Sequence, residues 1–184
     1  MEDDLLELRR FDEGDIDQLC AVITDPRLHL EWTGPEYTYP LDARQLQETL
    51  AKTRGQRPSF KAYKAVLPGT GETVGHVQLM DIDYAKATCV LGKVLIFPPY
   101  RGRGLGKALV RMAVNEAFVS LGLRKMTLLV FDFNEAAIAT YRSLGFVPSP
   151  PDPGDLMFEG ESWHAIAMTV TRERWSAEHT LERK

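Results

Sequence analysis

The chain has 184 residues, of which 44% are hydrophobic and 26% charged, and these proportions predict one globular domain over residues 1–184. Its net charge of −4 argues against general nucleic-acid binding, which needs a basic surface, and suits a cationic acceptor better. No apolar run reaches membrane-spanning length and Met1–Asp4 is acidic, so no membrane association is expected and the protein is expected to be cytoplasmic.

The first third of the chain predicts a strand, two helices and a polar loop between the helices. Leu5–Arg10 is typical of a strand, and Asp12 predicts the N-cap of the first helix. The segment Trp32–Pro40 is too rich in glycine and proline for a regular element, so we expect a loop there. Asp42 predicts the cap of a second helix, which ends near Gly55.

The middle of the chain predicts three strands joined by tight turns. Lysines alternate with apolar residues in Phe60–Leu67, which predicts a strand that is exposed on one side. Pro68–Gly71 predicts a hairpin turn into a returning strand over Thr73–Ile82, and the next strand covers Ala87–Phe97.

The remaining elements follow an amphipathic helix that begins near residue 105. Met126–Phe131 is a continuous apolar run, typical of a strand covered on both faces. A short helix over Asn134–Leu144, a proline-rich loop over Pro148–Gly160 and a strand over Trp163–Thr171 come next. The charged tail 172–184 is either a terminal helix or frayed. The elements predict a mixed α/β fold, in which one sheet has helices on both faces.

The most informative segment is Arg101-Gly102-Arg103-Gly104-Leu105-Gly106-Lys107, which joins a strand to the amphipathic helix. Glycines let the backbone turn tightly and leave bare N–H groups facing a ligand. The helix start adds free N–H donors and the positive end of a dipole. The arginines and Lys107 add mobile positive charge, so the segment predicts a site for a phosphate group.

Two other phosphate-binding patterns fail at this segment. A P-loop needs a serine or threonine after the lysine to hold magnesium, and Ala108 stands there. A dinucleotide fingerprint needs glycine or alanine at Lys107 and an acidic residue after the next strand, which Leu128–Phe131 does not supply. Cys20 and Cys89 lie far apart, and no His, Asp or Glu set has ligand spacing, so no metal is expected.

Residues 101–106 match the pattern Arg/Gln-x-x-Gly-x-Gly/Ala, and the segment closely resembles the coenzyme A loop of the GCN5-related N-acetyltransferases, the GNAT family. The resemblance extends over nearly the whole chain and is strongest from Thr73 to Phe146. It implies a mostly antiparallel sheet splayed between its fourth and fifth strands, and acetyl-CoA as co-substrate. The loop Trp32–Tyr39 is similar, less specifically, to the ribosomal-protein N-terminal acetyltransferases.

The segment Asn134–Phe146 matches a second pattern of the family, Asn-x-x-Ala-x-x-x-Tyr-x-x-x-Gly-Phe. An alternative is that Asn134 merely caps a helix whose apolar stripe includes Tyr141. The two residues share a helix face about 10 Å apart, so both can line one elongated ligand. By resemblance, Asn134 contacts the pantetheine arm and the Tyr141 hydroxyl lies near the CoA sulfur, where a phenol can protonate the departing thiolate.

The resemblance also gives a role to the strand before the glycine loop. In the family this strand splays from its neighbour and leaves amides free for the pantetheine and the acetyl carbonyl, where an N–H group can stabilise an oxyanion. The residues assigned to donor binding are Val94, Leu95, Ile96, Arg101, Gly102, Arg103, Gly104, Leu105, Gly106, Lys107 and Asn134.

The general base is left open. A lysine-like amine has a pKa of about 10.4 and an α-amine one of about 8, so the acceptor decides how strong a base is needed. Each candidate carboxylate can equally be an ordinary surface charge. A water relay to any carboxylate would also remove the proton from the amine. The candidates are Glu36, His76, Asp81, Asp83 and Asp132.

The leading hypothesis is an N-acetyltransferase that works by direct transfer in a ternary complex, with a small-molecule amine or a peptide N-terminal amine as acceptor. Another acyl group or a bulkier amine such as an aminoglycoside is an alternative, as is a non-catalytic CoA-sensing or protein-interaction module. We expect two loops, Trp32–Tyr39 and Pro148–Gly160, to form the walls of the acceptor site. Carboxylates in them, such as Asp155, suit a cationic amine; the alternative is that they are solvated loop charges. The oligomeric state stays open, a homodimer included.

Overall fold

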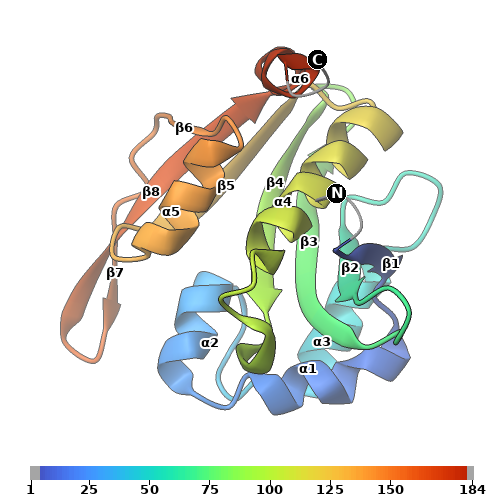
Figure 1. The fold of residues 1–184 in the computed structure, drawn as a ribbon. Coiled ribbons are helices and arrows are strands. Elements are labelled where there is room, and N and C mark those ends of the chain that lie inside the picture. Colours follow the sequence, from blue (N-terminus) through green and yellow to red (C-terminus); the bar gives the residue numbers. More distant parts are fainter. Residues whose placement is uncertain (1–4, 182–184) are drawn as a thin grey trace.

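The computed structural model describes residues 5–181, with side chains through residue 177. Met1–Asp4 and residues 182–184 of the charged tail therefore lie outside the described residues. One sheet has the strand order β1-β2-β3-β4-β5-β8-β6, and β7 pairs with β8 alone (Figure 1). The strands are β1 Glu7–Arg10, β2 Lys61–Val66, β3 Thr73–Asp83, β4 Thr88–Ile96, β5 Lys125–Phe131, β6 Val147–Pro148, β7 Asp155–Phe158 and β8 Glu161–Thr171. The helices are α1 Ile16–Val22, α2 Pro26–Thr33, α3 Ala43–Ala51, α4 Leu105–Asn115, α5 Glu135–Ser143 and α6 Arg172–Leu181.

The sheet splits between β4 and β5, as the predicted fold class requires. These two strands are parallel, whereas their other pairings are antiparallel. Their register covers only Thr88–Val90 on β4, although β4 continues to Ile96. A bulge at Lys93, whose φ is 54°, interrupts the pairing of β4 with β3 just beyond this point. A bulge bends and twists its strand, which helps β4 to diverge from β5.

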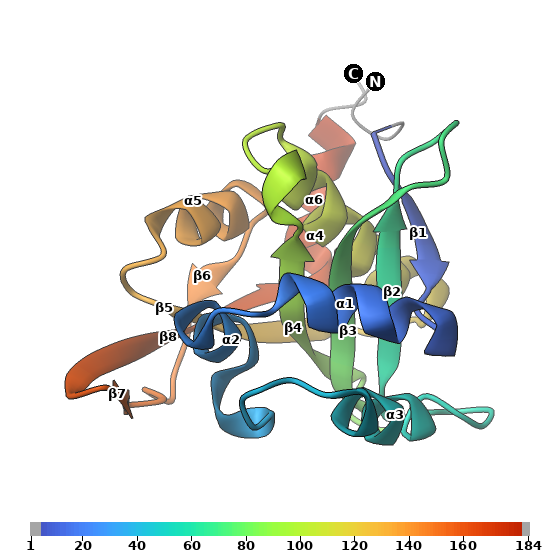
Figure 2. The same cartoon turned by 90° about the horizontal axis from the view of Figure 1, so that it is seen from below.

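Helices cover both faces of the sheet and form two cores. On one face, α1, α2 and α3 pack around Leu95 and Phe97 of the β4 region. On the other face, the α4 residue Leu109 packs with Val77 and Leu79 of β3. Figure 2 shows α1 and α3 next to β2, β3 and β4, while α5 and β7 lie toward the β5 and β8 end of the sheet. The mixed α/β prediction with helices on both faces is confirmed.

The predicted caps at Asp42 and Asn134 are present, whereas Asp12 caps a 3-10 turn, Glu13–Asp15, that precedes α1. The side-chain oxygens of Asp12, Asp42 and Asn134 each accept a hydrogen bond from a backbone N–H two or three residues further on, over 2.9, 2.9 and 3.1 Å. The helix capped by Asp42 ends at Ala51 rather than near Gly55. The described part of the charged tail is a terminal helix that reaches Leu181, and it is not frayed.

Two segments predicted to be loops contain regular structure. Trp32 and Thr33 end helix α2, and a 3-10 turn, η3 Gly34–Glu36, follows. The helix forms because the Asp25 side chain caps it, accepting from Leu28 N over 2.7 Å, and because proline suits the first turn. The loop predicted over Pro148–Gly160 contains β7, which pairs with β8 as a projecting hairpin.

The two strand predictions based on exposure were wrong. Residues Ala62, Tyr63, Ala65 and Val66 of β2 are buried, and its lysines are partly buried because each forms an ion pair with an acidic side chain of another element. On β5, burial alternates instead of being continuous, and Leu129 is 61% exposed. Leu129 lines a cavity beside the split, so its side chain is not covered by the core.

We expect Gly75→Ala to lower the free energy of unfolding by about 1–3 kcal/mol, as overpacking commonly does. An alanine Cβ at Gly75 would lie 2.5 Å from the Leu95 carbonyl oxygen, a backbone atom of β4 that cannot move aside on its own. Gly106→Ala is the matched control, because its Cβ would meet only an Ile96 side-chain carbon at 4.0 Å. Urea denaturation should separate the variants, and equal stability would contradict the close β3–β4 contact.

Candidate active site

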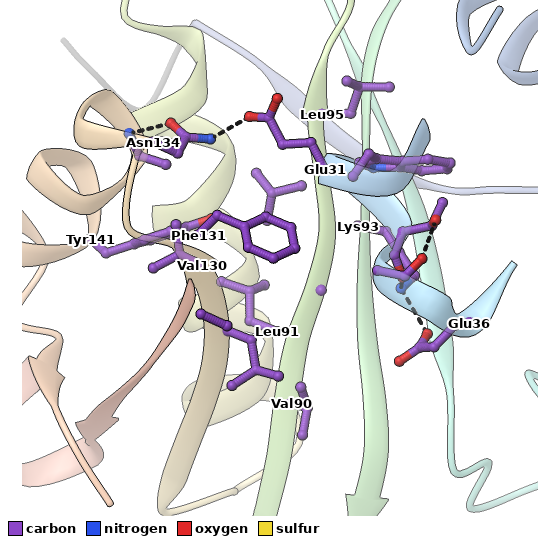
Figure 3. Close-up of a pocket in the computed structure, with 18 of the residues that line it drawn as sticks. Glu31, Glu36, Val90, Leu91, Lys93, Leu95, Val130, Phe131, Asn134 and Tyr141 are labelled. Atoms are coloured by element: carbon purple, nitrogen blue, oxygen red, sulfur yellow. Dashed lines mark hydrogen bonds and ion pairs between the residues drawn. The ribbon is translucent and has the colours of Figure 1, made fainter. Parts of the chain in front are cut away.

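A cavity of about 700 Å³ lies where β4 and β5 diverge. Its walls come from α2 and η3 on one side and from β5, α5 and the loop before β7 on the other. Figure 3 shows side chains from both walls turned toward this space, with β4 running between them. Most of the lining is apolar, with a few polar and charged groups among them, which is typical of a small-molecule site.

The glycine loop borders the cavity through Arg101 and Gly106. Gly102 and Gly104 have φ values of 75° and 76°, a left-handed conformation that a larger side chain would strain. Helix α4 begins at Leu105 without a side-chain cap, so the N–H groups of its first turn lack partners within the helix. The backbone therefore presents free donors, as a pyrophosphate held without metal requires.

The arginines of the loop bind backbone carbonyls just before it. Arg101 Nε donates to Ile96 O over 3.0 Å, and an Arg103 guanidinium N–H donates to Pro99 O over 3.2 Å. Leu105 is buried in the core. Gly102, Arg103, Gly104, Leu105 and Lys107 are not among the residues that line the cavity itself.

The strand residues predicted to meet the donor do line the cavity. Val94, Leu95 and Ile96 all border it. The part of β4 beyond Val90 has no pairing with β5 in the described chain, so its edge on this side is open. Unpaired backbone groups in such a position need a ligand or water as partner.

Asn134 and Tyr141 of the α5 region lie in the same cavity. The Asn134 side-chain oxygen accepts from Ala137 N, and its Nδ2 donates to Glu31 Oε1 over 2.8 Å. The Tyr141 ring is packed against Phe146 with a centroid separation of 5.7 Å. Burial raises the pKa of the Tyr141 phenol to about 12, so the hydroxyl keeps its proton at neutral pH.

The five candidate bases are scattered, and only Glu36 lines the cavity. His76 is buried edge-on against Phe11 and Trp32, and burial, assisted by the Lys93 charge, lowers its pKa to about 3. Asp83 caps the turn after β3, where hydrogen bonds from Lys86 lower its pKa. Asp81 and Asp132 are not among the lining residues either.

A buried lysine that no sequence motif marks, Lys93, lies beside Glu36. Lys93 Nζ is 2.7 Å from a Glu36 carboxylate oxygen and donates to Thr33 O, also over 2.7 Å. The Lys93 side chain is 5% exposed, whereas Glu36 is 52% exposed. Burial lowers the pKa of Lys93, and the Glu36 charge opposes that shift. The ion pair fixes η3 to β4, on the other side of β4 from Tyr141 in Figure 3.

Glu31 is the second residue of the cavity that the sequence analysis missed. It lies in α2, and Figure 3 shows its side chain extending past β4 toward Asn134. The Asp25-Pro26 pair was the available signal for this helix, because an aspartate followed by proline is a strong helix start. Nothing in the sequence indicates the contact with Asn134, which lies 103 positions away.

The two loops predicted to wall the acceptor site both contribute to the cavity. Trp32–Glu36 line it from one side and Pro153–Leu156 from the other. Asp155 is among these residues, and it accepts from Ser162 over 2.6 Å and pairs with His164 at 2.7 Å.

Residues 5–181 have neither of two further site types. None of the helices is long and apolar enough to cross a membrane. Within the same residues, no three His, Cys, Asp or Glu side chains are grouped so that they could hold a metal ion.

Comparisons with known proteins agree with this architecture. A sequence model of the acetyltransferase (GNAT) family matches residues 27–146. The spermidine N(1)-acetyltransferase of Escherichia coli (strain K12) is 34% identical over 178 residues, covering 95% of this chain and 90% of that enzyme. The thialysine N-epsilon-acetyltransferase of Sus scrofa is 27% identical over 169 residues, covering 86% and 89%.

A solved structure shows the same fold. The crystal structure of the spermidine N-acetyltransferase from Vibrio cholerae in complex with CoA and spermine matches with a TM-score of 0.81, over 93% of this chain and 98% of that chain. The sequence identity is 20%, so this match supports the fold rather than the substrate.

We expect Lys93→Met to lower the free energy of unfolding by about 1–3 kcal/mol, because the Thr33 carbonyl loses its buried donor and η3 loses its anchor on β4. The remaining Glu36 carboxylate is half exposed and can be hydrated, which keeps the loss moderate. Arg44→Met is the control, since it breaks an exposed pair with Glu48 and should leave stability unchanged. Urea denaturation measures both, and equal losses would count against an anchoring role for Lys93.

Proposed function

Since this chain belongs to the acetyltransferase (GNAT) family, we propose that it moves the acetyl group of acetyl-CoA to a primary amine of a polyamine such as spermidine. The observation that carries the proposal is the similarity to the spermidine N(1)-acetyltransferase of Escherichia coli, which extends over 95% of this chain. The same comparisons show that the chain is an N-acetyltransferase. The proposal concerns which amine it acetylates.

The cavity supports a cationic acceptor with apolar segments. A polyamine alternates ammonium groups with methylene chains, so it needs carboxylates and apolar surface close together. Glu31, Glu36 and Asp155 supply carboxylates, and Leu129 and Phe131 supply apolar surface of β5. The net charge of −4 also favours the approach of a cation.

Donor binding is assigned to the glycine loop and the open edge of β4. The free N–H groups at the start of α4 suit the pyrophosphate of acetyl-CoA, and Arg101 borders the same space. The open edge at Val94–Ile96 suits the amides of the pantetheine arm and the thioester carbonyl. Arg103 and Lys107 add charge near the loop rather than inside the cavity.

The chemistry is direct transfer in a ternary complex. The acceptor ammonium first loses a proton to water, and the neutral nitrogen then attacks the thioester carbonyl. The C–N bond forms, the C–S bond breaks and CoA leaves as a thiol, while the second proton of the attacking nitrogen replaces the one that Tyr141 gives up. A backbone N–H of the open β4 edge stabilises the oxyanion, and the Tyr141 hydroxyl gives its proton to the sulfur. The raised pKa of Tyr141, about 12, keeps that proton available over the alkaline range in which the amine becomes neutral.

The acceptor assignment is tested with purified protein, acetyl-CoA and a panel of amines, by following thiol release. Spermidine and spermine should react with a higher kcat/KM than thialysine or a peptide with a free N-terminus. Preference for the peptide would contradict a polyamine acceptor. Tight CoA binding without turnover of any amine would instead favour a CoA-sensing module.

We expect Tyr141→Phe to lower kcat by about 100-fold, because the thiolate would leave without a proton donor. The affinity for CoA should be unchanged, since the ring remains. Tyr63→Phe is the matched control: the Tyr63 hydroxyl donates to Glu116 over 2.7 Å, away from the cavity, so kcat should not change. Steady-state kinetics and CoA titration give the two quantities, and an unaltered kcat in Tyr141→Phe would remove Tyr141 from the mechanism.

A further inference from the structure

Three carboxylates line the cavity, and they differ in what offsets their charge. Glu36 lies 2.7 Å from the Lys93 ammonium, and Asp155 lies 2.7 Å from the His164 ring. Glu31 has no ion pair among those of the described residues, and its hydrogen-bond partner is the neutral amide of Asn134. Glu31 therefore has the carboxylate whose charge is most available to a ligand.

The position of the Glu31 carboxylate is fixed from both ends. Its backbone belongs to α2, which the Asp25 cap starts and which packs against β4. At the other end, the Asn134 oxygen is occupied by Ala137 N, so the Asn134 NH2 group must face Glu31. The orientation of this amide thus follows from the helix cap. A neutral donor holds the carboxylate in place without cancelling its charge.

The carboxylate is held at the start of α5, whereas Tyr141 comes two helical turns later. Seven residues correspond to about 10 Å along the helix axis, so Glu31 is held some way from the proposed acid. Figure 3 shows the Phe131 ring below the Glu31–Asn134 pair, on the same wall as Val130, which gives apolar surface near the carboxylate. This arrangement suits a second amine of the acceptor better than the reacting one, which must be neutral when it attacks.

We propose that Glu31 binds the non-reacting ammonium of the acceptor and thereby selects amines that have a second positive charge. The inference rests on the proposed polyamine acetylation and adds the residue that recognises the substrate. Of the other two cavity carboxylates, Glu36 is paired with the Lys93 ammonium and Asp155 already accepts hydrogen bonds from Ser162 and His164, so Glu31 is the specificity-determining residue. Its loss weakens acceptor binding and leaves the chemical step in place.

The test compares spermidine with butylamine, which has one amine and no second charge. In Glu31→Gln, the KM for spermidine should rise about 10-fold or more, since a charge-assisted hydrogen bond is lost. The KM for butylamine and both kcat values should stay as in the wild type. Glu31→Asp keeps the charge on a shorter side chain, so it should recover part of the affinity for spermidine.

The controls separate this effect from folding and from net charge. Glu48→Gln makes the same charge change on the exposed surface of α3 and should leave both KM values unchanged. Calorimetric Kd values for the two amines, measured with CoA present, give the same comparison without turnover. Thermal unfolding of Glu31→Gln shows whether its fold is retained, and Glu31→Asp gives a second reading if the fold is weakened.

Each outcome decides the question. A loss confined to spermidine, with partial recovery in Glu31→Asp, supports the proposal. Equal losses for spermidine and butylamine, or no loss for either, overturn it while the proposed function stands. Failure of the wild-type protein to acetylate or bind any polyamine overturns the proposed function and this inference together.

Discussion

The early end of the pairing between β4 and β5 is the constraint on which the site depends. Two parallel strands that stay paired leave no space between them, whereas these two share a register only as far as Val90 of β4. The split opens the edge of β4 at Val94–Ile96 and leaves Leu129 of β5 uncovered. An open edge inside a domain is unfavourable unless something occupies it, and here it borders the cavity in which the donor is proposed to bind.

The bulge at Lys93 connects the split to the acceptor side of the cavity. It bends β4 and directs the Lys93 ammonium to Thr33 O and Glu36, so the strand to which donor binding is assigned also holds α2 and η3. Burying an ammonium is costly unless it is paired and hydrogen-bonded, and both partners are present. The ion pair offsets the charge of Glu36, whereas Glu31 has no ion pair within the described residues. One strand irregularity thereby contributes to the shape of the cavity and to its electrostatics.

The sequence predicted the features that depend on short segments. The glycine loop, the cap at Asn134 and most strands could be recognised because their signals span a few neighbouring residues. The pairs Lys93–Glu36 and Glu31–Asn134 join residues far apart in sequence, so only the fold brings them together. The prediction that β5 is buried on both faces was wrong for the same reason, because the sequence does not distinguish an exposed leucine such as Leu129 from a buried one. Helix α2 is different, because Asp25-Pro26 was a readable start signal that the glycines and prolines further on obscured.

Asn134 links the two halves of the proposed reaction. Its oxygen is committed to the cap of α5, so its NH2 group is the part that can change partners. In the present structure that group donates to Glu31, and Asn134 lines the same cavity as the open edge of β4, to which donor binding is assigned. A ligand that takes this donor would release the Glu31 carboxylate and strengthen its attraction for an ammonium. Occupancy of the donor wall and affinity for a cationic acceptor would then be coupled through one side chain, and linkage would require the coupling to act in both directions.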